Sequence, residues 1–63
     1  MSNRRLKARR ILVGLTQKEL GEIVGVSEYK VSMYETGRCI PTPEIKKQVA
    51  ERLGVKTFEI WDA

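Results

Sequence analysis

Residues 15–37 read LTQKELGEIVGVSEYKVSMYETG, and this pattern predicts two short helices joined by a three-residue turn. Thr16 is a suitable N-cap for the first helix, and Glu19 three residues later completes a capping box. Apolar residues then recur at helical spacing on one face. They are Leu20, Ile23 and Val24. Gly25 ends the helix, because glycine takes the left-handed conformation without a steric penalty.

The second helix follows the same pattern. Ser27 caps it, and Gly37 marks its end. Val31 and Tyr34 are three residues apart and are expected to face inward. Because the turn has room only for residues 25–27, the two helices must meet at a steep angle.

Gly21 lies inside the first of these helices, where a glycine costs roughly 1 kcal/mol relative to alanine. The other glycines all fall at predicted helix ends. They are Gly14, Gly25, Gly37 and Gly54. We therefore interpret Gly21 as a place where the two helices pack closely, rather than as a weak point.

Three further helices are predicted around this pair. One runs from near Arg4 to Val13. Another starts after Thr42, with Pro43 at its first position, and ends at Gly54. Its core stripe is Ile45, Val49 and Leu53. A last short helix follows residues 55–57 and is expected to close the core with three apolar side chains. These are Phe58, Ile60 and Trp61.

Positive charge gathers in the first helix. Five basic residues and no acid precede residue 11, whereas the rest of the chain has seven basic and eight acidic residues. The five are Arg4, Arg5, Lys7, Arg9 and Arg10. Cations near a helix N-terminus oppose the helix dipole, so a phosphate-bearing partner would explain them. A solvated basic face is the other interpretation.

Arg10 lies on the same side of this helix as Leu6 and Val13. If that side is buried, Arg10 needs an anionic partner, and Glu35 beside Tyr34 is the best candidate. The alternative is that Arg10 contacts a phosphate at the surface.

Two apolar residues, Ile11 and Leu12, lie on the opposite side of the first helix. They form either a small surface for a partner or a face that neighbouring helices shield.

The composition excludes several classes of function. The chain has no histidine and one cysteine, so histidine-based catalysis, a zinc cluster and a disulfide framework are not expected. No apolar run approaches the roughly 20 residues of a membrane span. The basic start lacks the apolar stretch of a signal peptide. We expect a cytoplasmic protein that is not an enzyme and uses no metal or cofactor. With 63 residues there is no room for a sensor domain, so no small-molecule ligand is expected.

Taken together, these residues resemble the lambda-repressor-like, Cro-type (XRE) family of transcriptional regulators. The matching positions cover nearly the whole chain. They are Arg10, Leu15, Thr16, Gln17, Leu20, Gly21, residues 24–27, Val31, Glu35, Gly37, Pro41, Ile45, Val49, Ala50 and residues 53–55. In the family, arginine and glutamate are often paired at positions 10 and 35. This chain departs from the family with Arg9, Ile11 and Leu12, where position 9 is commonly apolar and positions 11 and 12 are usually polar.

The resemblance implies a single all-α domain over residues 1–63, with five compactly packed helices and a central helix-turn-helix at about residues 16–36. It implies sequence-specific binding of double-stranded DNA by a transcriptional regulator, with two copies of the chain pairing on an inverted-repeat operator. The second motif helix would enter the major groove, N-terminal end first.

With Val31 and Tyr34 in the core, the outward positions of that helix are available to read bases. The resemblance points to positions 28, 29 and 33. Glu28 can accept from a cytosine amino group, and Met33 can contact a thymine methyl group. Tyr29 can reach a base edge or a phosphate. We expect the base-reading residues to be Glu28, Tyr29, Ser32 and Met33.

Other polar residues are expected to contact phosphates. Gln17 begins the first motif helix, where backbone N–H groups favour an anion, and the family commonly uses this glutamine on a phosphate. The full expected set is Thr16, Gln17, Ser27, Lys30, Thr36 and Arg38.

A function of another class stays open. The chain could instead be a small helical protein-interaction module, either antitoxin-like or a partner of RNA polymerase. Ile11, Leu12 and Trp61 are the residues that favour this alternative.

Overall fold

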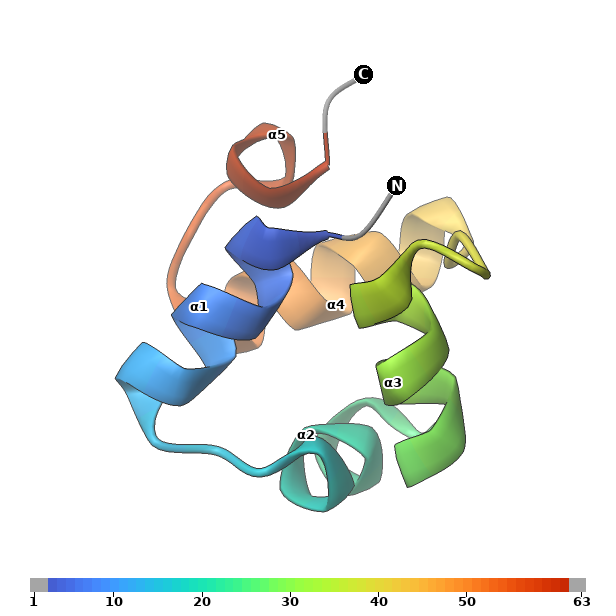
Figure 1. Ribbon diagram of the computed structural model, residues 1–63. Helices are drawn as coiled ribbons and strands as arrows, with labels where there is room; N and C mark the ends of the chain where they lie inside the picture. The colour runs from blue at the N-terminus through green and yellow to red at the C-terminus, as the bar shows by residue number, and fades with distance from the viewer. Residues whose placement is uncertain (1–2, 62–63) are drawn as a thin grey trace.

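The computed structural model describes residues 3–61, and all five predicted helices lie within this range (Figure 1). The ends of the predicted domain, residues 1–2 and 62–63, lie outside the described residues. The helices are α1 (Arg4–Val13), α2 (Gln17–Val24), α3 (Glu28–Thr36), α4 (Pro43–Leu53) and α5 (Thr57–Ile60).

Side-chain caps fix where the helices begin. The Thr16 hydroxyl accepts from the Glu19 backbone N–H at 3.0 Å, and the Glu19 carboxylate accepts from the Thr16 N–H at 2.8 Å. Ser27 and Thr42 cap α3 and α4 in the same way. The predicted caps of α2, α3 and α4 are therefore all present, and Asn3 supplies a further cap for α1.

The steep angle between α2 and α3 depends on Gly21. A Cβ atom at this position would lie 2.6 Å from the backbone oxygen of Val26, in the turn that leads to α3. No side chain fits there without displacing that backbone. The interpretation of Gly21 as a close-packing site is confirmed.

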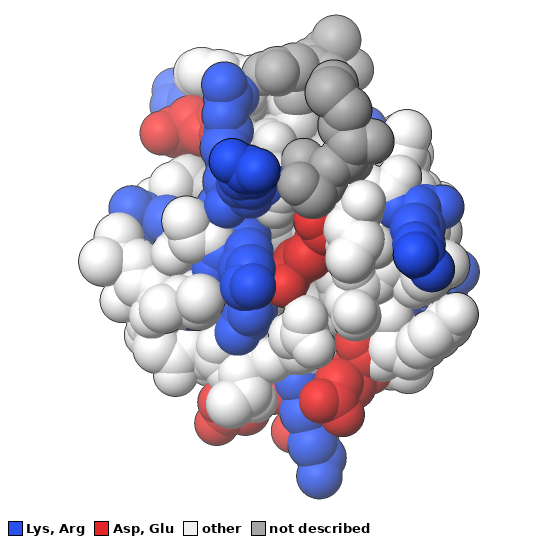
Figure 2. All heavy atoms as spheres, in the orientation of Figure 1, with Lys and Arg blue, Asp and Glu red and all other residues white. Residues whose placement is uncertain are grey.

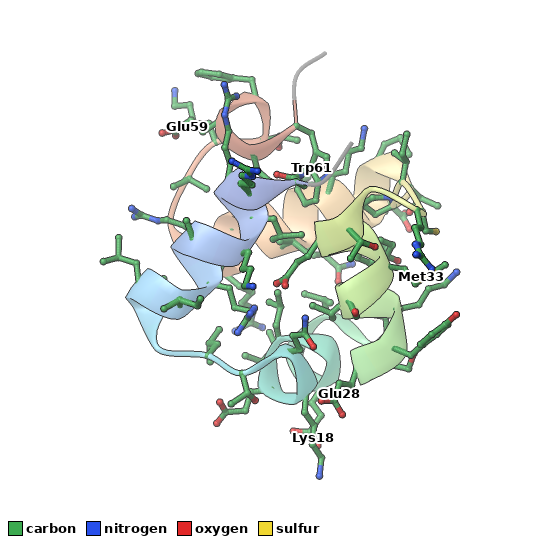
Figure 3. All side chains as sticks on the ribbon, in the orientation of Figure 1. Lys18, Glu28, Met33, Glu59 and Trp61 are labelled. Carbon is green, nitrogen blue, oxygen red and sulfur yellow. The ribbon has the colours of Figure 1, made fainter. Side chains whose placement is uncertain are left out.

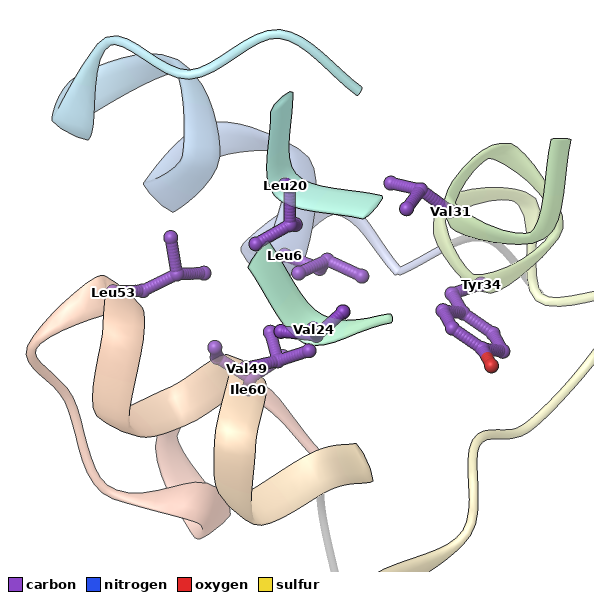
Figure 4. Packing of buried hydrophobic residues seen from close by; sticks show 8 residues of the cluster. All are labelled: Leu6, Leu20, Val24, Val31, Tyr34, Val49, Leu53 and Ile60. Atoms are coloured by element: carbon purple, nitrogen blue, oxygen red, sulfur yellow. The ribbon is translucent and has the colours of Figure 1, made fainter. Parts of the chain in front are cut away.

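The helices enclose one hydrophobic core, to which every helix contributes (Figure 4). α4 packs against α1 and α2, and α5 packs against α1 and α4. The buried core residues are Leu6, Leu20, Val24, Val31, Tyr34, Val49, Leu53 and Ile60. Within residues 3–61, the outer side of α3 is left exposed, as at Tyr29.

Two apolar residues expected to face the core, Phe58 and Ile23, are exposed. Phe58 is 66% exposed, because α5 has a single turn and only one of its sides, that of Ile60, can face the core. Ile23 and Val13 are 40% and 45% exposed. Val13 is the last residue of α1 and is exposed, although Leu6 and Arg10 on the same side of the helix are buried. Trp61 follows α5 and packs, partly buried, against the core.

Candidate nucleic-acid interface

The rotation of α3 is set by three buried residues, Val31, Tyr34 and Glu35. The remaining positions face outward or lie at the edge of the buried side. Glu28 and Tyr29 are exposed, the latter to 71%. Ser32 and Met33 are half-buried. Figure 3 shows Met33 on the side of α3 away from α1, and Glu28 at the start of α3 near Lys18 of α2. The four expected base-reading residues therefore lie together on one helix and reach solvent.

The C-terminal end of α3 is held by its own hydrogen bonds. The backbone N–H of Arg38 donates to the Met33 carbonyl at 3.0 Å, and the Thr36 hydroxyl donates to the same carbonyl at 3.2 Å. Because the Thr36 hydrogen is used in this way, Thr36 must leave the Met33 carbonyl before it can donate to a phosphate.

Lys30 and Arg38 are exposed and lie near the loop that follows α3. The Lys30 ammonium lies 3.7 Å from the sulfur of Cys39 and donates to it, which holds the lysine toward this loop. Figure 2 shows a group of basic side chains on the right of the molecule, beside α3 and this loop. One edge of α3 is therefore positively charged.

A buried polar network connects the other edge of α3 to α1 and to the start of α2. Arg10 and Glu35 are 7% and 6% exposed, and Arg10 Nε donates to Glu35 Oε2 at 2.6 Å. The same guanidinium donates to the Leu15 carbonyl at 2.7 Å. Gln17 Nε2 donates to Glu35 Oε1 at 2.9 Å. Glu35 thus ties α1 and the start of α2 to α3, and Arg10 lies in this interior pair rather than at the surface.

The contact between Gln17 and Glu35 is a feature that the sequence did not indicate. A carboxylate only accepts hydrogen bonds, so the amide nitrogen of Gln17 must face Glu35. Gln17 is consequently held in one orientation at the N-terminus of α2, which is the end where an anion is favoured.

The caps of α2 and α3 are both hydroxyl side chains, those of Thr16 and Ser27. Thr16 and Ser27 accept hydrogen bonds from backbone N–H groups, so the hydrogen of the Ser27 hydroxyl is left to be donated to another group. The Thr16 hydroxyl also interacts with the Glu19 carboxylate and must turn from it to donate to a phosphate. Both residues are exposed, in keeping with the expected phosphate contacts.

The outer side of α1 is apolar at its C-terminal end. Ile11 and Leu12 are 57% and 73% exposed, so neighbouring helices do not shield them. Trp61 does not extend this surface, because it packs against the core.

No helix within residues 3–61 is long and apolar enough to cross a membrane. The same described stretch brings no three histidine, cysteine or acidic side chains together in a way that could hold a metal ion.

Comparison with known proteins finds a matching family model and several solved structures with a similar fold. A family model described as helix-turn-helix matches residues 6–60. The crystal structure of the P22 c2 repressor in complex with a synthetic operator has a TM-score of 0.90 and 27% identity, and the match covers 95% of this chain and 91% of that chain. The clp gene regulator ClgR from Corynebacterium glutamicum has a TM-score of 0.85 and 29% identity, with 92% of this chain and 62% of that chain covered.

The transcriptional regulator BswR is also similar, with a TM-score of 0.81 and 38% identity, and the match covers 90% of this chain and 60% of that chain. The chain therefore spans most of the P22 structure but less than two thirds of ClgR and BswR. None of the curated proteins compared with the sequence matches it.

Proposed function

The chain belongs to the lambda-repressor-like (XRE) helix-turn-helix family of DNA-binding transcriptional regulators, and on that premise we propose that it reads a specific duplex operator with α3 in the major groove. The observation that carries this proposal is the division of α3 into a buried side and an uncovered side. The uncovered side presents Glu28, Tyr29, Ser32 and Met33 at a place where no other helix blocks the approach of a duplex.

The chemistry of these side chains favours particular bases. Glu28 can accept from the amino group of a cytosine, and its charge would disfavour the acceptor-rich edge of a guanine. Met33 offers a flexible apolar contact for a thymine methyl group. Tyr29 and Ser32 supply hydroxyl groups that can donate or accept.

Phosphate contacts would hold α3 in register without reading sequence. Lys30 and Arg38 supply charge on one edge of α3. Gln17 is the donor at the other edge, oriented by Glu35. Ser27 adds a hydroxyl donor at the N-terminus of α3. Thr16 and Thr36 can join it only after their hydroxyls turn away from the groups that they contact within the chain.

We further propose that two copies bind an inverted repeat. A single module of this size covers roughly 600–1,000 Å² of surface on DNA, which is modest for specific binding. Pairing would place two α3 helices about one turn of DNA apart. A regulator of this class acts where the DNA is, so we propose a cytoplasmic location, which suits a chain whose one cysteine has no disulfide partner.

Selection of bound duplexes from a random pool tests the proposal. We expect a recurring half-site, present as an inverted repeat with centres about 10 base pairs apart. The matched control is Glu28→Ala, which should bind a pool whose preference is relaxed at one base pair of each half-site. Recovery of no preferred sequence, with the folded protein at the same concentration, would contradict the proposal.

A further inference from the structure

A groove of about 280 Å³ lies between α1 and α5, on a side of the molecule that the proposed DNA interface does not use (Figure 1). Its lining comes from α1, from Val55 and from α5. Figure 3 shows Glu59 of this groove and Met33 of α3 on different sides of the molecule, at the upper left and the right. A molecule in the groove would therefore leave the exposed side of α3 accessible.

One face of α1 forms a wall of this groove. The residues that line it are three, four and seven positions apart, which places them in one row on the helix. They are Arg5, Ala8, Arg9 and Leu12. Leu12 is 73% exposed, and the neighbouring Ile11 is 57% exposed. Val55 and Ile60 supply apolar surface on the opposite wall. Exposed apolar surface that is continuous in this way marks a site of interaction with another molecule.

Arg9 is held beside the groove by the end of α4. Its Nε donates to the Leu53 carbonyl at 3.1 Å, at a helix C-terminus, where a cation is favoured. Because this bond uses Nε, the two terminal nitrogens are the ones that can pair side by side with the two oxygens of a carboxylate. Arg9 is therefore a fixed basic group at the edge of an apolar surface.

The charge of the groove favours an acidic partner. Two arginines and one glutamate line it, and α1 itself has no acidic residue. The carboxylate of that glutamate, Glu59, accepts from the backbone N–H of Lys56 at 2.8 Å, so it is turned toward the start of α5. A carboxylate brought by a partner would meet a net positive surface.

The shape of the groove favours a helix as the occupant. Pockets that enclose a small molecule have volumes of roughly 300–1,000 Å³, whereas this groove is smaller and open to solvent, so a small molecule would stay largely exposed. A partner that adds a β-strand needs a sheet edge, and residues 3–61 form helices only. An amphipathic helix can lie between two helical walls, with its apolar side chains in the groove.

We propose that this groove docks an acidic amphipathic helix of another protein, with an aliphatic side chain against Leu12 and Val55 and a carboxylate on Arg9. Arg9 and Leu12 are two of the positions at which this chain departs from its family, so the docking surface belongs to this chain rather than to the helix-turn-helix fold in general. The proposal goes beyond the proposed function and does not depend on it.

The first test is a selection from a phage-displayed library of helical peptides with one face randomised, using the wild-type chain as the bait. We expect enrichment of peptides that carry leucine, isoleucine or methionine one helical turn from aspartate or glutamate. If no peptide is enriched, or if the enriched peptides are basic or neutral, the proposal is wrong.

The binding site is located with one enriched peptide, made synthetically, and two matched variants. Leu12→Gln and Ile40→Gln each remove an apolar side chain that is 73% exposed, but Ile40 lies in the loop after α3. We expect Leu12→Gln to weaken peptide binding roughly tenfold, because a buried leucine contact is lost, and Ile40→Gln to change it less than about twofold. Thermal melts should be nearly unchanged, since both changes are at the surface. Equal losses would contradict the proposal.

The contact with Arg9 is tested by pairing changes in the peptide with changes in the chain. Each acidic residue of the peptide is replaced in turn by its amide. At one position the change should weaken wild-type binding roughly three- to tenfold but weaken Arg9→Gln no further, because both changes remove the same contact. Lys7→Gln is the control, since it removes a charge from α1 outside the groove and should keep the full loss. Absence of coupling at every position would contradict the contact.

Two further measurements test where the partner docks and what it is. The peptide should bind with an affinity changed by less than about twofold when the chain is saturated with its selected duplex, and displacement by the duplex would contradict the assignment to the side of α1 and α5. Sedimentation of the chain without peptide or DNA tests for a second copy in the groove. Self-association that Leu12→Gln abolishes would show that the occupant is this chain and that the proposal is wrong.

Discussion

Glu28 and Glu35 lie seven residues apart on the same helix, which places them on nearly the same side of α3. Their surroundings are opposite. Glu28 is exposed at the start of the helix, whereas Glu35 is 6% exposed beneath α1 and the start of α2. The neighbouring helices, rather than the periodicity of α3, determine that one glutamate is available to DNA and the other holds the fold together. Changing Glu35 should therefore affect the stability of the domain, whereas changing Glu28 should affect its preference for particular DNA sequences.

The largest expected effect is on stability, at Glu35. In Glu35→Gln, Arg10 keeps its charge in a buried place without a carboxylate, which costs up to about 3–5 kcal/mol. Arg10→Met strands Glu35 in the same way. A domain of this size has a total stability of only about 3–9 kcal/mol, so either variant approaches unfolding at 25 °C. Denaturant titration measures both.

The double variant Arg10→Met/Glu35→Gln is the control for this pair. Because neither charge is then stranded, its loss should be smaller than the sum of the two single losses. Single losses below about 1 kcal/mol that simply add would show that the pair is not coupled.

Glu28→Ala should leave stability within about 0.5 kcal/mol, as surface changes usually do. Its effect should fall on sequence preference, with a loss of about 1–3 kcal/mol of discrimination at the base pair that Glu28 contacts. Met33→Ala should do the same at a different base pair. Competition binding with duplexes changed at single positions measures both, and an unchanged profile for Glu28→Ala would remove it from the base-reading set.

Lys30→Ala should weaken binding to all duplexes by a similar factor, because phosphate contacts carry no sequence information. The slope of log K against log salt should fall by about 1. The wild type itself should lose at least tenfold in affinity between about 50 and 200 mM salt. An affinity that is insensitive to salt would contradict the assignment of Lys30 and Arg38 to the DNA backbone.

The smallest expected effect concerns Glu19, in the capping box of α2. Hydrogen bonds from the backbone N–H and the side chain of Thr16 lower the pKa of this carboxyl below its ordinary value of 4.5. The charged form is thus favoured in the folded state, and the stabilisation it gives is complete above the unfolded pKa. It is lost as the pH falls below about 4.5 and through the folded pKa.

The control for Glu19 is Glu19→Gln, which keeps an acceptor for the cap but does not titrate. Melting temperatures measured from pH 7 to pH 2 should fall less steeply for this variant than for the wild type. If the two curves run parallel, protonation of the Glu19 carboxylate does not change the stability of the folded state.

Local chemistry made much of the fold predictable. Caps such as Thr16 and Ser27, and the glycine stops, depend on neighbouring residues alone, so helix ends could be placed from the sequence. The Arg10–Glu35 pair was foreseeable because a charge on a buried side requires a partner. The family resemblance supported the same pairing.

Other features depend on how helices meet, which no local pattern encodes. Ile60 is the buried residue of the one-turn helix α5, and Phe58 lies two residues before it, on another side of the helix. The exposure of Phe58 therefore depends on how α5 packs against α1 and α4. The orientation of Gln17 requires Glu35 from another helix at 2.9 Å. The place of Arg9 beside the end of α4 likewise depends on the path of α1.

The central claim is that the uncovered side of α3 meets DNA, and chemical-shift mapping with the selected duplex tests it most directly. We expect the largest amide shifts within residues 28–33 and at Gln17, with little change at Ile11, Leu12 and Phe58, which are exposed outside the proposed interface. Shifts confined to these apolar residues, with α3 unaffected, would contradict the claim.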